Sequence, residues 1–97
     1  MTDKMIKEFA HDRDTALAEM SLPKFKRFLK KWFPNIPIPD DEVLECSMRK
    51  MALECTNLTF EVKERACLWL MEHNYRTDML GDPIEQRYIR MKEEVLQ

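Results

Sequence analysis

The sequence predicts an all-α fold, a compact bundle of four to five short helices around one core. The 97-residue chain contains a single glycine, whereas turn-rich β proteins and phosphate-binding loops need several. Apolar side chains recur at helical spacing along most of the chain. They make up 44% of the composition, and one domain of this length can bury a modest core without disulfides or metals.

The first helical segment is expected between residues 2 and 20. Asp12 and Asp14 are both candidate N-caps for a short helix that follows them. The sequence leaves open whether the residues before His11 form a helix of their own. Phe9 suits a loosely packed turn in that region.

The second helix is the most sharply marked in the first half of the chain. Ser21 is a candidate N-cap, and Pro23 is tolerated in a first helical turn. The helix must end near Phe33, because Pro34 disfavours helical geometry in the residue before it. One apolar stripe follows helical spacing and comprises Phe25, Phe28, Leu29 and Trp32. The opposite arc carries five cations, Lys24, Lys26, Arg27, Lys30 and Lys31.

A connector and a third helix follow. Three prolines within residues 34–39 predict a stiff, extended connector. Asp40 or Asp41 is expected to cap the third helix. The predicted inward face of this helix comprises Leu44, Met48, Met51, Ala52 and Cys55. Cys46 and Leu53 lie on roughly the opposite side, so that side is also expected to meet a neighbour.

The fourth helix is expected to begin at Thr59 and to be the most buried of the bundle. Its apolar residues extend over most of its circumference, which is typical of a central helix. Trp69 is expected to anchor the core. Asn74 suits the left-handed conformation that ends a helix, after which Tyr75 can fold back on the last turn.

The segment from Asp82 to Glu85 predicts the start of a fifth helix. Asp82 is the expected N-cap, Pro83 the first helical residue and Glu85 the third, as in a capping box. The apolar stripe of this helix has the width that one partner helix covers, and it comprises Ile84, Tyr88, Met91 and Val95. This helix is therefore expected to cap the bundle or to mediate a homodimer. Residues 1–97 are predicted to form one domain, with 79–97 as an appended C-terminal helix.

Charge and cysteine content indicate the cellular setting. The net charge of −2 predicts no general attraction to nucleic acid or to anionic lipid. No apolar run is long enough to span a membrane, and the first residues do not form a signal peptide. The odd number of cysteines, three, favours reduced thiols. We expect a cytoplasmic protein without a membrane partner.

The candidate nucleophiles and metal ligands form no recognised catalytic pattern, so we predict no enzyme activity. Cys67 and His73 are six residues apart on one helix and point about 120° away from each other. We therefore predict no cofactor and no metal. Zinc is a minor alternative, because five potential ligands could converge across helices, although they lack the CxxC spacing of a strong zinc signal: His11, Cys46, Cys55, Cys67 and His73.

The basic arc of the second helix is the best candidate for partner binding. It comprises Lys24, Lys26, Arg27, Lys30 and Lys31. Such an arc is either an ordinary solvated face or a contact surface for an acidic protein, a nucleic-acid backbone or, less favoured, an anionic membrane. The aromatic residues of the same helix point inward, so they are not expected to stack on bases.

Several short motifs within residues 12–78 carry a resemblance to known proteins. They are Asp12-Arg13-Asp14, Ala16-Leu17, the lysine-rich helix around Lys30-Lys31, Pro39-Asp40-Asp41-Glu42-Val43 and Trp69-Leu70-Met71-Glu72-His73-Asn74-Tyr75. With them, this region resembles a group of small proteins encoded in phages and prophages of Firmicutes-type bacteria. Members of the group carry a His-Lys pair in the third helix where this chain has Arg49-Lys50, so a role tied to that histidine does not transfer.

The resemblance implies a phage origin and a function against host defences. The chain is similar in size and composition to anti-CRISPR proteins, which is an argument by analogy. The sequence therefore favours a non-enzymatic binding protein that blocks a host protein, with a CRISPR-Cas effector as a candidate partner and nucleic acid not expected as the sole partner. The alternatives are a small DNA-binding regulator that uses a basic helix and a zinc-stabilised interaction module.

Overall fold

The computed structural model describes residues 2–97 and confirms the all-α prediction. The helices of this part of the chain are α1 (Asp3–Glu19), α2 (Leu22–Trp32), α3 (Asp41–Glu54), α4 (Phe60–Glu72) and α5 (Ile84–Leu96). The connector of residues 34–39 is extended between α2 and α3, as predicted from its prolines.

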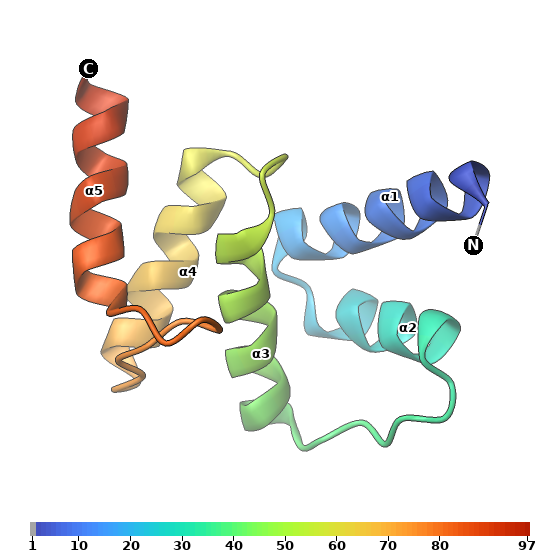
Figure 1. Ribbon diagram of the computed structural model, residues 1–97. Helices are drawn as coiled ribbons and strands as arrows, with labels where there is room; N and C mark the ends of the chain where they lie inside the picture. The colour runs from blue at the N-terminus through green and yellow to red at the C-terminus, as the bar shows by residue number, and fades with distance from the viewer. Residues whose placement is uncertain (1) are drawn as a thin grey trace.

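α3 lies between the pair α1 and α2 on one side and α4 on the other, and α5 lies on the far side of α4 (Figure 1). α3 packs against α1 and α2 and also against α4, while α5 packs against α4. α3, which contacts three helices, is therefore more central than α4, although α4 buries as many side chains as α3 does: Val62, Ala66, Cys67 and Leu70. α3 takes the central place because it is buried on two sides: Leu44, Met48 and Ala52 share one side, and Leu53 lies on the other.

α1 is one continuous helix, so the prediction that it begins at Asp12 or Asp14 is wrong. Thr2 caps it, and its hydroxyl accepts a hydrogen bond from the backbone N–H of Met5 over 3.2 Å. Both aspartates lie within the helix. The helix extends beyond them towards the N-terminus because Phe9 has aromatic partners on and after α2: Phe28, Trp32 and Phe33.

The other predicted helix caps are confirmed where they depend on local sequence. The side chains of Ser21, Asp40 and Thr59 each accept a hydrogen bond from the backbone N–H three residues later. Asp40, rather than Asp41, is therefore the cap of α3. Asn74 adopts the left-handed conformation after α4, with φ of 66°.

The core joins side chains from all five helices. On α2, Phe25 and Phe28 are buried, while Leu29 and Trp32 are half-buried against the core. The largest fully buried side chains are Leu17, Phe25, Leu44, Met48, Leu53, Cys67, Leu70 and Ile84. Because Ile84 opens α5, the first turn of that helix is part of the core rather than an addition to its surface.

The predicted start of α5 needs a correction. The helix begins at Ile84, and no side chain caps it, so Asp82 is not its N-cap. The backbone of Asp82 is instead engaged by Asp78, four residues earlier. The predicted stripe on α5 faces α4 over its first half, where the hydroxyl of Tyr88 donates a hydrogen bond to Glu64 over 2.8 Å. Beyond that, α5 extends past the first turn of α4 (Figure 1), and Val95 is exposed.

A buried carboxylate organises the loop between α4 and α5. The side chain of Asp78 is fully buried. Its Oδ1 accepts hydrogen bonds from the backbone N–H groups of Leu80 and Asp82, each over 2.9 Å. Its Oδ2 accepts one from Nη1 of Arg87 over 2.7 Å. The carboxylate therefore fixes the loop and holds it against α5.

The guanidinium of Arg87 connects this loop to the end of α3. Nη1 also donates to Oε1 of Glu54 over 2.6 Å, and Nη2 donates to the backbone carbonyl of Leu53 over 2.5 Å. Because the last turn of a helix leaves its carbonyl groups without intrahelical partners, Arg87 satisfies one of them while it anchors α5.

This arrangement lowers the pKa of Asp78. Burial raises the pKa, but hydrogen bonds from Arg87 and from the backbone of Asp82 and Leu80 outweigh it and hold the pKa below its ordinary value of 3.8. A carboxylate with a lowered pKa in the folded state stabilises the fold above the ordinary pKa. That contribution is lost as the pH falls through the folded-state value.

We predict that Asp78→Ala lowers the free energy of unfolding at neutral pH by about 3 kcal/mol. This is the low end of the range for breaking a buried ion pair, because Arg87 keeps partial contact with solvent. Urea melts at pH 7 and below pH 4 measure the loss, which should shrink at the lower pH. The control is Asp82→Ala, which keeps the backbone contacts of the loop. A loss that is the same at both pH values would contradict this prediction.

Candidate functional site

The basic arc predicted from the sequence lies on the outer side of α2. The helix buries Phe25 and Phe28 towards the core, so its cations are directed to solvent or to the flanking helices. Their availability to a partner depends on which of the five positive charges are already compensated within the protein.

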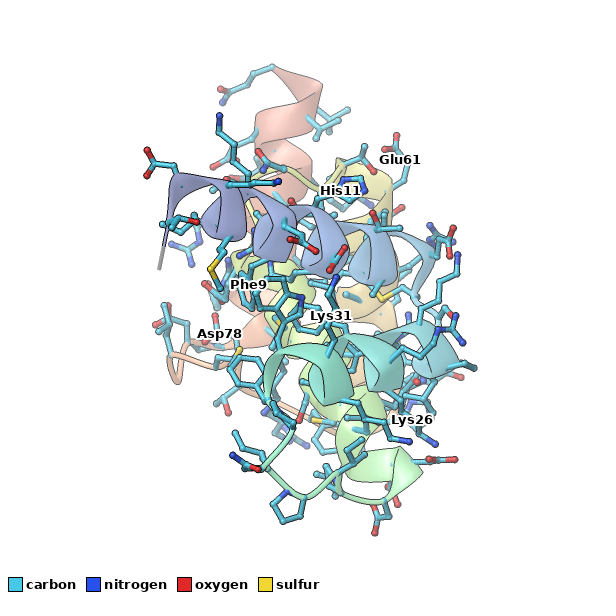
Figure 2. All side chains as sticks on the ribbon, turned by 90° about the vertical axis from the view of Figure 1, so that its right-hand side faces the viewer. Phe9, His11, Lys26, Lys31, Glu61 and Asp78 are labelled. Atoms are coloured by element: carbon cyan, nitrogen blue, oxygen red, sulfur yellow. The ribbon has the colours of Figure 1, made fainter. Side chains whose placement is uncertain are left out.

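Three of the five cations form ion pairs with neighbouring elements. Lys24 pairs with Glu19 at the end of α1. Lys26 pairs with Asp41 of α3 over 2.7 Å. Lys31 pairs with carboxylates of α1 and extends towards that helix, whereas Lys26 lies at the other edge of α2 (Figure 2). These three charges are therefore compensated by carboxylates of the flanking helices.

Lys31 is the most engaged of the five. Its ammonium lies 2.8 Å from both Glu8 and Asp12, and it is positioned over the ring of Trp32. The indole N–H of Trp32 donates to the same oxygen of Asp12 over 3.1 Å. Hydrogen bonds from Lys31 and Trp32 lower the pKa of Asp12, and those to Asp12 and Glu8 raise the pKa of Lys31.

Arg27 and Lys30 are the two members of the arc that form no ion pair within residues 2–97. Both side chains are exposed. They are three residues apart on α2 and therefore adjacent on its surface. Of the residues predicted for partner binding, these two are available to a partner without breaking a contact inside the protein.

A shallow groove separates α1 and α2 beside Arg27. It has a volume of about 310 Å³, and six of the eight residues that line it are polar or charged. Its lining comprises His11, Asp12, Thr15, Ala16, Lys24, Arg27, Phe28 and Lys31. An acidic side chain of a partner that contacts Arg27 would find a recess next to it.

The cysteines occupy separate positions that are partly or fully buried. Cys46 is half-buried, whereas Cys55 and Cys67 are buried. Burial is the largest influence on each thiol and raises its pKa, to about 11 for Cys67. Among residues 2–97, no three His, Cys, Asp or Glu side chains come together in a way that could hold a metal ion.

Sequence reasoning missed an aromatic stack at the end of α4. The ring of His73 stacks on Trp69 with centroids 4.0 Å apart, and Tyr75 stacks near the same indole at 5.9 Å. Arg49 of α3 is positioned over Trp69 and is paired with Glu45. Trp69 is half-buried, so the prediction that it anchors the core needs correction. The four-residue spacing of Trp69 and His73 was the available signal.

Comparisons with known proteins give this chain no relative. No protein-family model, no curated protein and no solved structure matches it. No helix within the described residues has the length and apolar character needed to cross a bilayer.

We predict that the three cysteines differ in reactivity towards a thiol reagent. Cys46 should react first in the native protein, because it is half-buried, and Cys55 and Cys67 should react slowly. All three should react quickly in denaturant. Mass spectrometry of the labelled peptides identifies the order. Equal rates for Cys46 and Cys67 in the native state, or about one zinc per chain by elemental analysis, would contradict this interpretation.

We also predict that Lys31→Glu destabilises the contact between α1 and α2. The new carboxylate would lie beside Glu8 and Asp12, where like charges repel. Denaturant melts at low and high salt measure the effect, which should decrease at high salt because the side chain is exposed. Lys30→Glu on the same helix is the matched control and should leave stability nearly unchanged. Equal losses for the two variants would refute the assignment.

Proposed function

We propose that this chain is a non-enzymatic binding protein that contacts an acidic surface of another protein through Arg27 and Lys30. The observation that carries the proposal is the pattern of charge pairing on α2. Three cations of the arc are used within the fold, and the two that remain are adjacent and exposed. Oppositely charged surfaces speed association and select the partner.

The class of partner follows from the resemblance of residues 12–78 to small phage proteins. It supports a phage-encoded inhibitor that acts in the bacterial cytoplasm on a host defence protein. A nucleic-acid-processing effector, such as the CRISPR-Cas effectors that anti-CRISPR proteins block, is the candidate of this class. Such effectors hold nucleic acid in positively charged channels, so the acidic contact surface would lie elsewhere on the effector.

The alternative function, a small DNA-binding regulator, would require the same residues to contact phosphate groups. Each phosphate contact contributes about 0.9 to the slope of log affinity against log salt. Two available cations would therefore give a slope of only about 1.8, which is small for a DNA-binding protein. The charge pairing on α2 thus favours a protein partner.

We predict that the double substitution Arg27→Glu and Lys30→Glu weakens binding to the partner while the fold is kept. Solvated substitutions of this kind change stability by about 0.5 kcal/mol or less. Affinity capture from a host lysate with mass spectrometry identifies the partner, and binding kinetics then measure the effect, expected mainly as slower association.

The matched control carries Lys4→Glu and Arg65→Glu, which reverse two exposed charges on α1 and α4. It should bind as the parent does. If the Arg27 and Lys30 variant is folded and binds equally well, the basic arc is only a solvated face. Binding to unrelated DNA that weakens steeply with salt would favour the regulator instead.

A further inference from the structure

α5 is the helix that contributes least to the core. Within residues 2–97, Ile84 is the one buried residue of α5, whereas each of the other four helices has at least two. Tyr88 and Met91 are half-buried, and every later residue of the helix is exposed. The free energy that opposes local unfolding depends largely on buried apolar area, so α5 is held less firmly than α1–α4.

Polar contacts complete the attachment of α5. Arg87 donates to Glu54 and to the backbone carbonyl of Leu53 at the end of α3. Tyr88 donates from its hydroxyl to Glu64 of α4. The side chains of Arg87 and Glu54 remain 22% and 30% exposed, so water can replace this contact when α5 leaves. The ion pair of Arg87 with Glu54 therefore adds little to the free energy that holds α5.

The loop of residues 76–83 is tied to α5. The buried carboxylate of Asp78 accepts hydrogen bonds from Arg87 of this helix and from two backbone N–H groups of the loop. The backbone N–H of Ile84 donates to the carbonyl of Arg76 over 3.0 Å. A helix of 13 residues is marginal on its own, so α5 would lose its helical order on leaving α4, and Asp78 would lose its guanidinium partner. The loop and α5 are therefore expected to open together.

One face of α4 lies beneath α5. Glu64, Cys67 and Met71 share this face, because they are three and four residues apart on the helix. Glu64 bonds to Tyr88, and Met71 lines the same cavity as Ile84. Cys67 lies between these two contacts and is fully buried. Its thiol is therefore covered by α5 and becomes accessible when this helix leaves.

We propose that residues 76–96 form a lid that opens as one unit while α1–α4 stay folded. In the closed form the lid masks the face of α4 that carries Cys67, and in the open form this face meets solvent. A ligand that binds only one of the two forms shifts the population between them. Figure 1 shows α5 and α2 on different sides of α3. The lid is therefore separate from the basic arc, and the proposal does not rest on the proposed function.

The thiol of Cys67 provides a measure of lid opening. The substitutions Cys46→Ala and Cys55→Ala leave it as the only one of the three cysteines. A thiol reagent reacts with it only in the open form, because burial in the closed form blocks access and raises its pKa to about 11. When closing is faster than labelling, the labelling rate follows the population of the open form.

Labelling of Cys67 should exceed, by at least about tenfold, the rate that global unfolding measured in urea melts accounts for. The dependence of the labelling rate on urea should also be shallower than that of global unfolding, because lid opening exposes less surface.

Substitutions in the two parts of this single-cysteine protein distinguish lid opening from global unfolding. Tyr88→Phe removes a hydrogen bond of the lid and should raise the labelling rate about tenfold. Asp78→Ala removes the buried carboxylate of the loop and should raise the rate about 100-fold. Phe28→Leu is the control, because Phe28 is buried in α2 and its contacts persist in the open form. It should lower the urea midpoint and leave the labelling of Cys67 unchanged.

Two labelling results would overturn the proposal. One is labelling that rises in Phe28→Leu in proportion to the loss of stability, because α5 then leaves only when the whole protein unfolds. The other is labelling that neither Tyr88→Phe nor Asp78→Ala changes, because the thiol is then reached by a motion outside the lid.

Amide hydrogen exchange tests whether the lid opens as one unit. The backbone N–H groups of Asp82, Ile84 and Arg87 each donate a hydrogen bond within the lid. They should exchange with the same free energy of opening, because they are released together. Unequal values that decrease towards the C-terminus would indicate stepwise fraying of the helix and would also overturn the proposal.

Discussion

Burial of α3 on two sides is the constraint on which the rest of the structure depends. Leu44, Met48 and Ala52 face one way and Leu53 faces the other, and each is almost completely buried. α1 and α2 pack against this helix, and so does α4, which in turn carries α5. A chain of this size buries only a modest apolar area in its core. Loss of the α1–α2 pair or of α4 would expose a buried side of α3 to water, so the parts of the fold stabilise one another.

The packing of α2 between α1 and α3 also determines which cations of the basic arc remain available to a partner. α1 and α3 flank α2 on its two sides. The lysines that α2 carries on these sides therefore lie near carboxylates of the flanking helices. Lys26 and Lys31 are used in this way. Exposed ion pairs of this kind contribute little each, but they neutralise most of the arc. Arg27 and Lys30 lie between the edges, where no carboxylate of the described residues reaches them, and they define the candidate site.

The sequence predicted the features that depend on neighbouring residues and failed where distant contacts decide. The caps at Ser21 and Thr59 are local, because the side chain bonds to a backbone group three residues away. Asp12 has the same potential, yet Phe9 continues the helix past it by packing on α2. Asp82 fits a cap by pattern, but its backbone is held by a buried carboxylate. The basic arc was predictable as a face, whereas its ion pairs required the positions of other helices.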